Sequence, residues 1–154
     1  MIPAKVTKAS QFLTVVLMVL VLLCLIGMKT ELLTVPLMLS KALISFYIFL
    51  LVVSIVLGIF ALLGLHHMYN NSEEITKLLN KQQIQAFLDQ PPKVKQIWGP
   101  ITLMSVAIIV LAIMSGLWFL ALAETISEIM TFYINSYGIA IYDKIKNLNR
   151  QEDA

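Results

Sequence analysis

The sequence predicts an all-helical membrane protein, and three observations carry this prediction. Residues 10–28, 42–65 and 97–123 contain no charged side chain, and about 20 apolar residues in a helix cross the roughly 30 Å hydrocarbon core of a bilayer. Of all residues, 59% are hydrophobic and 13% are charged, whereas a soluble domain has about 45–50% and about 25%. With a mean hydropathy of +0.87, the chain has more apolar side chains than a core of this size could bury, so lipid is expected to solvate much of the surface.

The first hairpin is expected to consist of spanning helices over residues 10–28 and 42–65. Lys5 and Lys8 precede the first of them, as in a secretion signal. Its apolar run is longer than the usual run of about 7–15 residues, and no small-residue cleavage site follows, so we expect an uncleaved helix. Pro36 lies in the short loop between the two spans and interrupts any helix there.

The chain after residue 97 decides the number of spans. Between residues 97 and 142 only Glu124 and Glu128 are charged, and this length holds two crossings, 97–119 and 124–142, joined by a turn near 120–123. These would form a second hairpin. The alternative is three spans followed by a C-terminal amphipathic helix.

The basic residues favour four spans, because cytoplasmic loops are enriched in Lys and Arg. With four spans, nine basic residues lie on the side of both termini and two lie opposite; with three, they divide six against five. The nine are Lys5, Lys8, Lys77, Lys81, Lys93, Lys95, Lys144, Lys146 and Arg150, and the two are Lys29 and Lys41. We therefore expect a single membrane domain over residues 1–154 in a bacterial inner membrane, with both termini and the tail 143–154 in the cytoplasm.

The cytoplasmic connector, residues 66–96, is expected to contain an amphipathic helix. Asn71 and Glu74 have the spacing of a capping box, and Pro91 ends the helix. Its apolar side chains form two opposed patches rather than one stripe, so a straight helix needs a second partner, or the helix breaks near Lys81. One of the patches consists of Ile84, Phe87 and Leu88. We interpret that patch as a candidate docking surface for a partner protein; the alternative is a kinked surface connector.

A polar stripe marks the last predicted helix. It consists of Glu124, Glu128, Thr131 and Asn135, at intervals of four, three and four residues, so its members share one face. Interfacial helices usually carry Lys or Arg on the polar face, so this acidic stripe is expected to face protein or water in a spanning helix. Glu128 lies one turn deeper in the membrane than Glu124 and is expected to matter more. The alternative is plain solvation of both carboxylates at a helix N-terminus, where the helix dipole favours negative charge.

Motifs for catalysis and for cofactor binding are absent from the sequence. It has no glycine-rich phosphate loop and no H-E-x-x-H, C-x-x-C or G-x-S-x-G pattern. The segments outside the predicted spans are too short to assemble a preorganised active site, and the net charge of +2 does not suggest nucleic-acid binding. We therefore expect no enzyme, cofactor or metal site.

Two function classes remain. The first is a small multi-pass protein that acts by helix packing with other membrane subunits or with itself, as an accessory or structural subunit or as a membrane-embedded inhibitor. Immunity proteins that act against pore-forming toxins are similar in size and span layout, which is an analogy only. The second class is a small oligomeric channel, holin or ion transporter that uses Glu124 and Glu128. The first class predicts a stripe that touches protein, and the second predicts a stripe that touches water.

Overall fold

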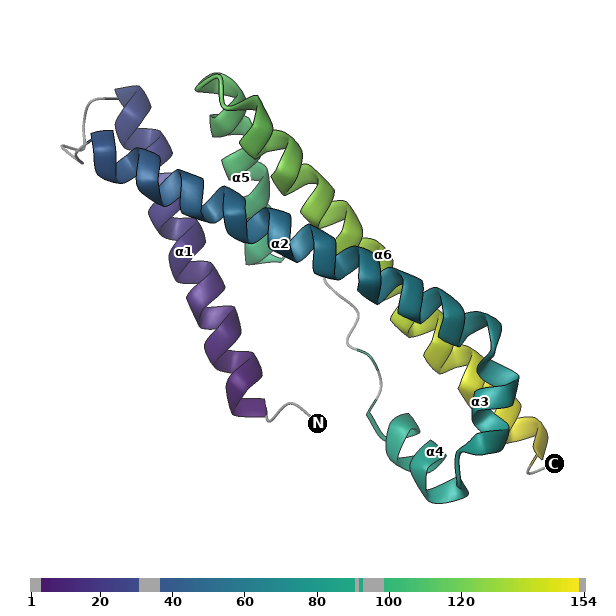
Figure 1. Cartoon of the computed structure of the whole chain (residues 1–154). Coiled ribbons are helices and arrows are strands. Elements are labelled where there is room, and N and C mark those ends of the chain that lie inside the picture. Colours follow the sequence, from purple (N-terminus) through teal and green to yellow (C-terminus); the bar gives the residue numbers. More distant parts are fainter. Residues whose placement is uncertain (1–3, 31–36, 91, 93–98, 153–154) are drawn as a thin grey trace. The chain divides into compact units, whose positions relative to one another are not determined.

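The computed structural model describes residues 4–30, 37–90, 92 and 99–152, and all regular structure in these ranges is helical (Figure 1). This confirms the predicted all-helical fold. The helices are α1 (Ala4–Thr30), α2 (Leu37–Asn70), α3 (Ser72–Leu78), α4 (Lys81–Leu88), α5 (Pro100–Met114) and α6 (Trp118–Glu152).

Among the described helices, two are long and apolar enough to span a membrane, namely the segment Gln11–Thr30 of α1 and the whole of α2. α5 is apolar but has 15 residues, which at 1.5 Å per residue is about 22 Å long. α6 has 35 residues but is more polar. Length and composition therefore support two of the four expected spans, and the other two stay a prediction.

The turn between α5 and α6 lies earlier than expected. The segment 120–123, which was expected to be the turn, is helical, and Leu120 is fully buried. The turn forms instead around Gly116, whose φ of +74° is accessible to glycine without the steric cost that a Cβ imposes. A lack of charge in this part of the sequence made the turn hard to place, and the single glycine was the usable signal.

Two other helix ends differ from expectation. α5 begins at Pro100, after residue 97, because proline at the first helical position needs no N–H partner and has a φ suited to a helix. α6 continues beyond residue 142 as far as Glu152, so most of the predicted tail is helical.

After the end of α2, the described part of the connector contains two helices, α3 and α4, rather than one. α3 begins directly after Asn71, which is its N-cap as expected, but among the described residues the Asn71 side chain makes no capping hydrogen bond. The capping box predicted there is therefore wrong. A complete capping box forms nine residues later: Asn80 Oδ1 accepts from the Gln83 N–H at 2.9 Å, and Gln83 Oε1 accepts from the Asn80 N–H at 3.1 Å. This box starts α4 at Lys81, so the connector adopts the break that was one of the two expected solutions.

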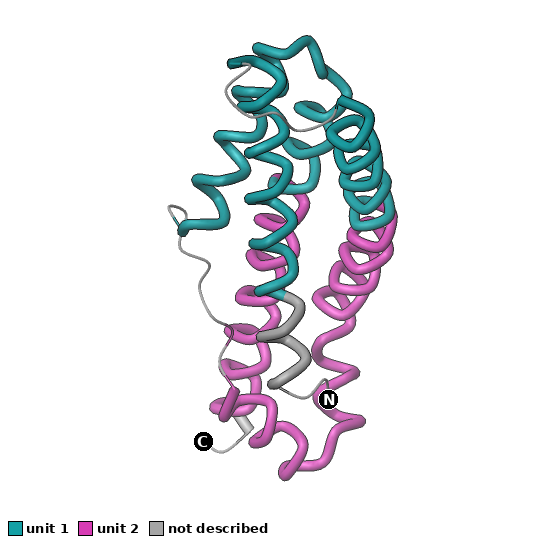
Figure 2. The backbone as a smooth tube through the Cα atoms, turned by 90° about the vertical axis from the view of Figure 1, so that its left-hand side faces the viewer, with its two compact units in different colours: residues 1–55, 97–128 teal, residues 56–96, 129–154 magenta. Residues whose placement is uncertain are grey.

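The chain divides into two compact units, which Figure 2 colours separately. Unit 1 comprises residues 1–55 and 97–128, and unit 2 comprises residues 56–96 and 129–154. α2 and α6 each contribute residues to both units.

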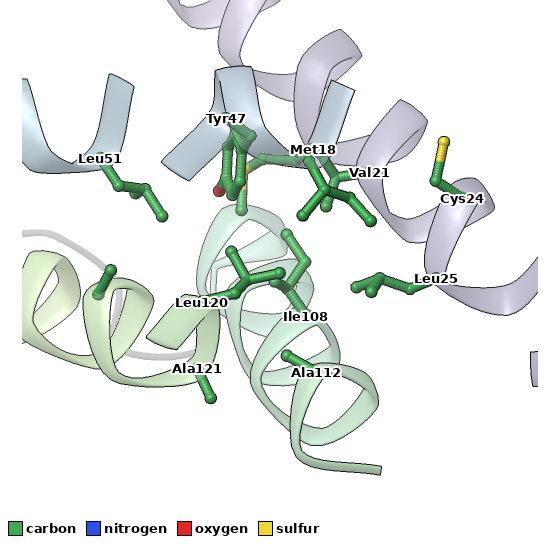
Figure 3. Packing of buried hydrophobic residues seen from close by; sticks show 12 residues of the cluster. Met18, Val21, Cys24, Leu25, Tyr47, Leu51, Ile108, Ala112, Leu120 and Ala121 are labelled. Atoms are coloured by element: carbon green, nitrogen blue, oxygen red, sulfur yellow. The ribbon is translucent and has the colours of Figure 1, made fainter. Parts of the chain in front are cut away.

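Each unit has its own apolar core. In unit 1, α1 packs against α5, and buried side chains from four helices meet (Figure 3). They include Met18, Val21 and Leu25 of α1, Tyr47 and Leu51 of α2, Ile108 and Ala112 of α5, and Leu120 and Ala121 of α6. In unit 2, a smaller core joins Ile84 of α4 to Ile141 and Ile145 of α6.

Candidate functional site

The first glutamate of the polar stripe lies within unit 1, among apolar side chains. Glu124 is only 3% exposed. Its Oε2 accepts a hydrogen bond of 2.8 Å from the hydroxyl of Tyr47, which α2 contributes to the same core (Figure 3). A buried polar atom left without a partner costs about 1–3 kcal/mol, so each of these two side chains satisfies the other.

The second glutamate lies one helical turn further along α6 and is paired in the same way. Glu128 is half-buried, and its Oε1 accepts a hydrogen bond of 2.8 Å from the hydroxyl of Ser105 in α5. Ser105 is 1% exposed. Ser105 and Glu128 also lie close enough to Glu124 to act on it electrostatically. We call these four side chains, Tyr47, Ser105, Glu124 and Glu128, the acidic cluster.

The acidic cluster ties α6 to α2 and to α5 through side-chain hydrogen bonds. Among the described residues, the groups that act on Glu124 include no cation, so its partners are hydroxyl donors. Such a set of oxygens can hold helices together or take up a proton. Within the described part of the chain, no three His, Cys, Asp or Glu side chains are grouped in a way that could hold a metal ion.

Glu124 is the more buried of the two glutamates, although Glu128 is the one expected to lie deeper in the membrane. Glu124 is enclosed by protein, whereas Glu128, which was expected to lie deeper in the membrane, is half-buried. Depth in a bilayer and enclosure by neighbouring helices are different quantities. The positions of the two glutamates along α6 predict their depth but not which helices enclose them.

The remaining stripe residues belong to unit 2. There Thr131 is exposed and Asn135 is half-buried. The structure thus brings Glu124 and Glu128 together with two hydroxyl groups, while Thr131 and Asn135 take no part in the Tyr47 and Ser105 hydrogen bonds.

The candidate docking patch on α4 is mostly covered by α6 of its own unit. Ile84 is 3% exposed and packs in the core of unit 2, with Leu88 beside it. The hydroxyl of Tyr142 donates a 2.8 Å hydrogen bond to the Leu88 carbonyl, and the Tyr142 ring lies 5.9 Å from the Phe87 ring. Phe87 keeps the largest exposed surface of the three, at 39%, and Leu88 is half-buried. The chain itself therefore supplies a partner for this patch.

Sequence reasoning missed two residues of the site, Ser105 and, at the greater distance along the chain, Tyr47. Its partner Glu124 lies 77 residues away, and pairing at that distance cannot be read from the periodicity of one helix. Its position gave no signal either, because Tyr47 lies five residues from the start of the uncharged stretch 42–65, near the headgroup level at which tyrosines of membrane proteins gather.

No family model, curated protein or solved structure matches the chain.

Proposed function

We propose that this is a four-span protein of a bacterial inner membrane, with both termini in the cytoplasm, that acts by packing against other membrane proteins. It would be an accessory or structural subunit of a complex or a membrane-embedded inhibitor. The acidic cluster carries this proposal, because hydroxyl groups of the chain's own helices bind both glutamates of the stripe. A stripe that touches protein is what the packing class predicts.

The direction of the helices in unit 2 supports four spans. A Cβ built on Gly58 would lie 2.6 Å from Met130 Cε, and Lys144 donates to the Tyr69 carbonyl at 3.0 Å. Contacts therefore advance in the same direction along α2 and α6, which run parallel there. In the four-span topology the second and fourth spans both run from the outside to the cytoplasm, so they must be parallel.

The start of α6 supports the same topology. Leu120, Ala121 and Ala123 are buried in the core that α1, α2 and α5 also form. A C-terminal helix that only lay on the membrane surface would bury its apolar face in lipid rather than among the spanning helices.

Exposed apolar faces supply the surface for packing. In unit 1, Phe12 of α1 is 71% exposed, and Phe46 and Phe49 of α2 are 55% and 61% exposed. Extended apolar surfaces mark contact with membrane or protein, and helices within a bilayer associate through close packing of such surfaces. These faces are the ones that we assign to lipid and to partner helices.

A channel or ion transporter is the second candidate. Ionisable residues within a spanning segment are functional by default, because inserting them is costly, and Glu128 is only half-buried. That second candidate requires water to reach the Glu128 carboxylate.

Purification from the native membrane in mild detergent tests the proposal. We expect a second membrane protein to co-purify in stoichiometric amount. In liposomes, the purified wild-type chain and its Glu128→Gln variant are expected to give no proton or ion flux above protein-free liposomes. Flux that Glu128→Gln abolishes, without a co-purifying protein, would replace the packing function by the channel.

Reporter fusions test the topology independently. A fusion after Ala154 is expected to report a cytoplasmic position. A periplasmic signal there, together with a cytoplasmic N-terminus, would establish three spans.

A further inference from the structure

Unit 2 contains an open groove of about 320 Å³ between α2 and α6. Its lining consists of Ile59, Leu62, Leu63 and His66 of α2 and Tyr133 and Tyr137 of α6. The volume is at the lower end of the range for ligand pockets, about 300–1,000 Å³. Between Ile59 and His66 the groove follows α2 for about 10 Å. It is therefore apolar along most of its length and polar at the end where α2 leaves the uncharged stretch.

A row of aromatic rings connects the polar end of the groove to a lysine. His66 Nδ1 lies 3.3 Å from the Tyr137 hydroxyl, and the Tyr137 ring meets the Tyr69 ring edge to face at 6.2 Å. Lys144 Nζ lies 4.7 Å from the centroid of that Tyr69 ring. An ammonium group has three donors, and Lys144 uses one of them on the Tyr69 carbonyl.

We propose that this groove binds an anionic phospholipid, with one acyl chain along Ile59, Leu62 and Leu63 and the phosphate beside His66 and Lys144. The inference rests on the membrane insertion proposed above, which places this end of the groove at the cytoplasmic surface. Tyrosines gather at the headgroup level, and basic pockets between helices on the cytoplasmic side bind anionic headgroups.

Charge complementarity favours a phospholipid over an apolar helix from a second copy. A packed helix would cover the aliphatic part of the groove but would offer no negative charge to Lys144. A phospholipid matches both ends at once, because its acyl chain is apolar and its phosphate is anionic.

Native mass spectrometry of the purified full-length chain, titrated with dioleoyl phosphatidylglycerol or dioleoyl phosphatidylcholine, tests the headgroup end. We expect tighter retention of phosphatidylglycerol, and we expect Lys144→Gln to weaken it about fivefold, as for loss of one basic residue near a membrane surface. Lys146→Gln is the matched control, because it removes the same charge from a lysine that lies over Tyr142 instead, at 5.9 Å. Equal weakening by both variants, or equal binding of the two lipids, would overturn the proposal.

A second pair of variants tests the acyl-chain end. Ile59→Trp fills the groove and should lower phosphatidylglycerol retention about fivefold or more, whereas Leu57→Trp, at a 63% exposed position outside the groove, should not. Unchanged retention with Ile59→Trp would contradict the proposal, as would competition by soluble glycerol phosphate, which would indicate a phosphate site without an acyl chain. A change in oligomeric state with Ile59→Trp at constant lipid retention would assign the groove to a second copy.

The lipid assay is separable from the proposed function. It needs no partner protein, so retained phosphatidylglycerol without a co-purifying protein would reject the packing function and keep the lipid site. Alkaline carbonate extraction of native membranes measures insertion by itself.

Discussion

The candidate site of unit 1 and the groove of unit 2 hold their polar side chains differently. In unit 1, Tyr47 and Glu124 are 5% and 3% exposed and bond to each other inside an apolar core. In unit 2, His66 and Tyr69 are exposed, and Lys144 is half-buried. A buried pair fixes the helices that carry it, because either group alone would be costly. The polar groups at the end of the unit 2 groove lie at the surface, where a ligand can reach them.

Of the substitutions that test this contrast, removal of the Glu124 side chain should lower the free energy of unfolding most. Glu124→Ala leaves the Tyr47 hydroxyl buried without an acceptor and opens space in the core, so we expect a loss of about 3 kcal/mol in the free energy of unfolding. Unfolding of the purified protein by SDS, followed by circular dichroism, measures this loss. Glu128→Ala, at the half-buried position, is expected to cost less than half as much. Equal losses would mean that burial does not distinguish the two glutamates.

Ile84 tests whether unit 2 has a core of its own. Ile84→Ala removes the α4 side chain that is buried against α6, and we expect a loss of about 2 kcal/mol, the lower end for truncation of a core isoleucine. Hydrogen exchange should then accelerate in α4 and leave α5 unchanged. Leu78→Ala, at an 85% exposed position, serves as the control and should change stability by less than about 0.5 kcal/mol. Faster exchange throughout unit 1 would contradict separate cores.

Substitution of the turn glycine, Gly116, should lower the free energy of unfolding by a smaller amount. Gly116→Ala forces a Cβ into a backbone with a φ of +74°, so we expect a loss of about 1 kcal/mol. Gly64→Ala is the matched substitution inside α2: nothing described lies within 4 Å of its added Cβ, and alanine is the better helix former. Gly64→Ala should therefore be neutral or stabilising in the same SDS titration. A neutral Gly116→Ala would show that the turn does not depend on glycine.

Much of the fold followed from composition, because three long uncharged stretches leave few options other than helices. The ends of the helices were predicted less accurately than their existence. Pro100 and Gly116 are local signals with clear physical meaning. Because no charge lies near them, the start of the helix was predicted at residue 97 and the turn at residues 120–123 instead. In the connector, Asn71 and Asn80 both have suitable residues three positions later and both precede a helix, but only Asn80 forms a capping box.

The candidate site was half predictable. The spacing of Glu124 and Glu128 on one helix face is a property of the sequence. So is the small number of hydroxyl side chains in the uncharged stretches, of which Ser105 is one. The partner of each carboxylate depends on which helices meet, and the Tyr47–Glu124 pair bridges 77 residues. The groove in unit 2 has the same origin, because His66 and Tyr137 are 71 residues apart.

A double-mutant cycle on Tyr47 and Glu124 tests most directly whether the acidic cluster is a packing device. Tyr47→Phe, Glu124→Ala and the double variant are compared with the wild type in the SDS titration. Side-chain hydrogen bonds between membrane helices couple by about 0.6 kcal/mol on average and up to about 1.7 kcal/mol, and we expect a coupling free energy within that range. Losses that add to within about 0.3 kcal/mol would mean that water, rather than Tyr47, satisfies Glu124, and would contradict the account.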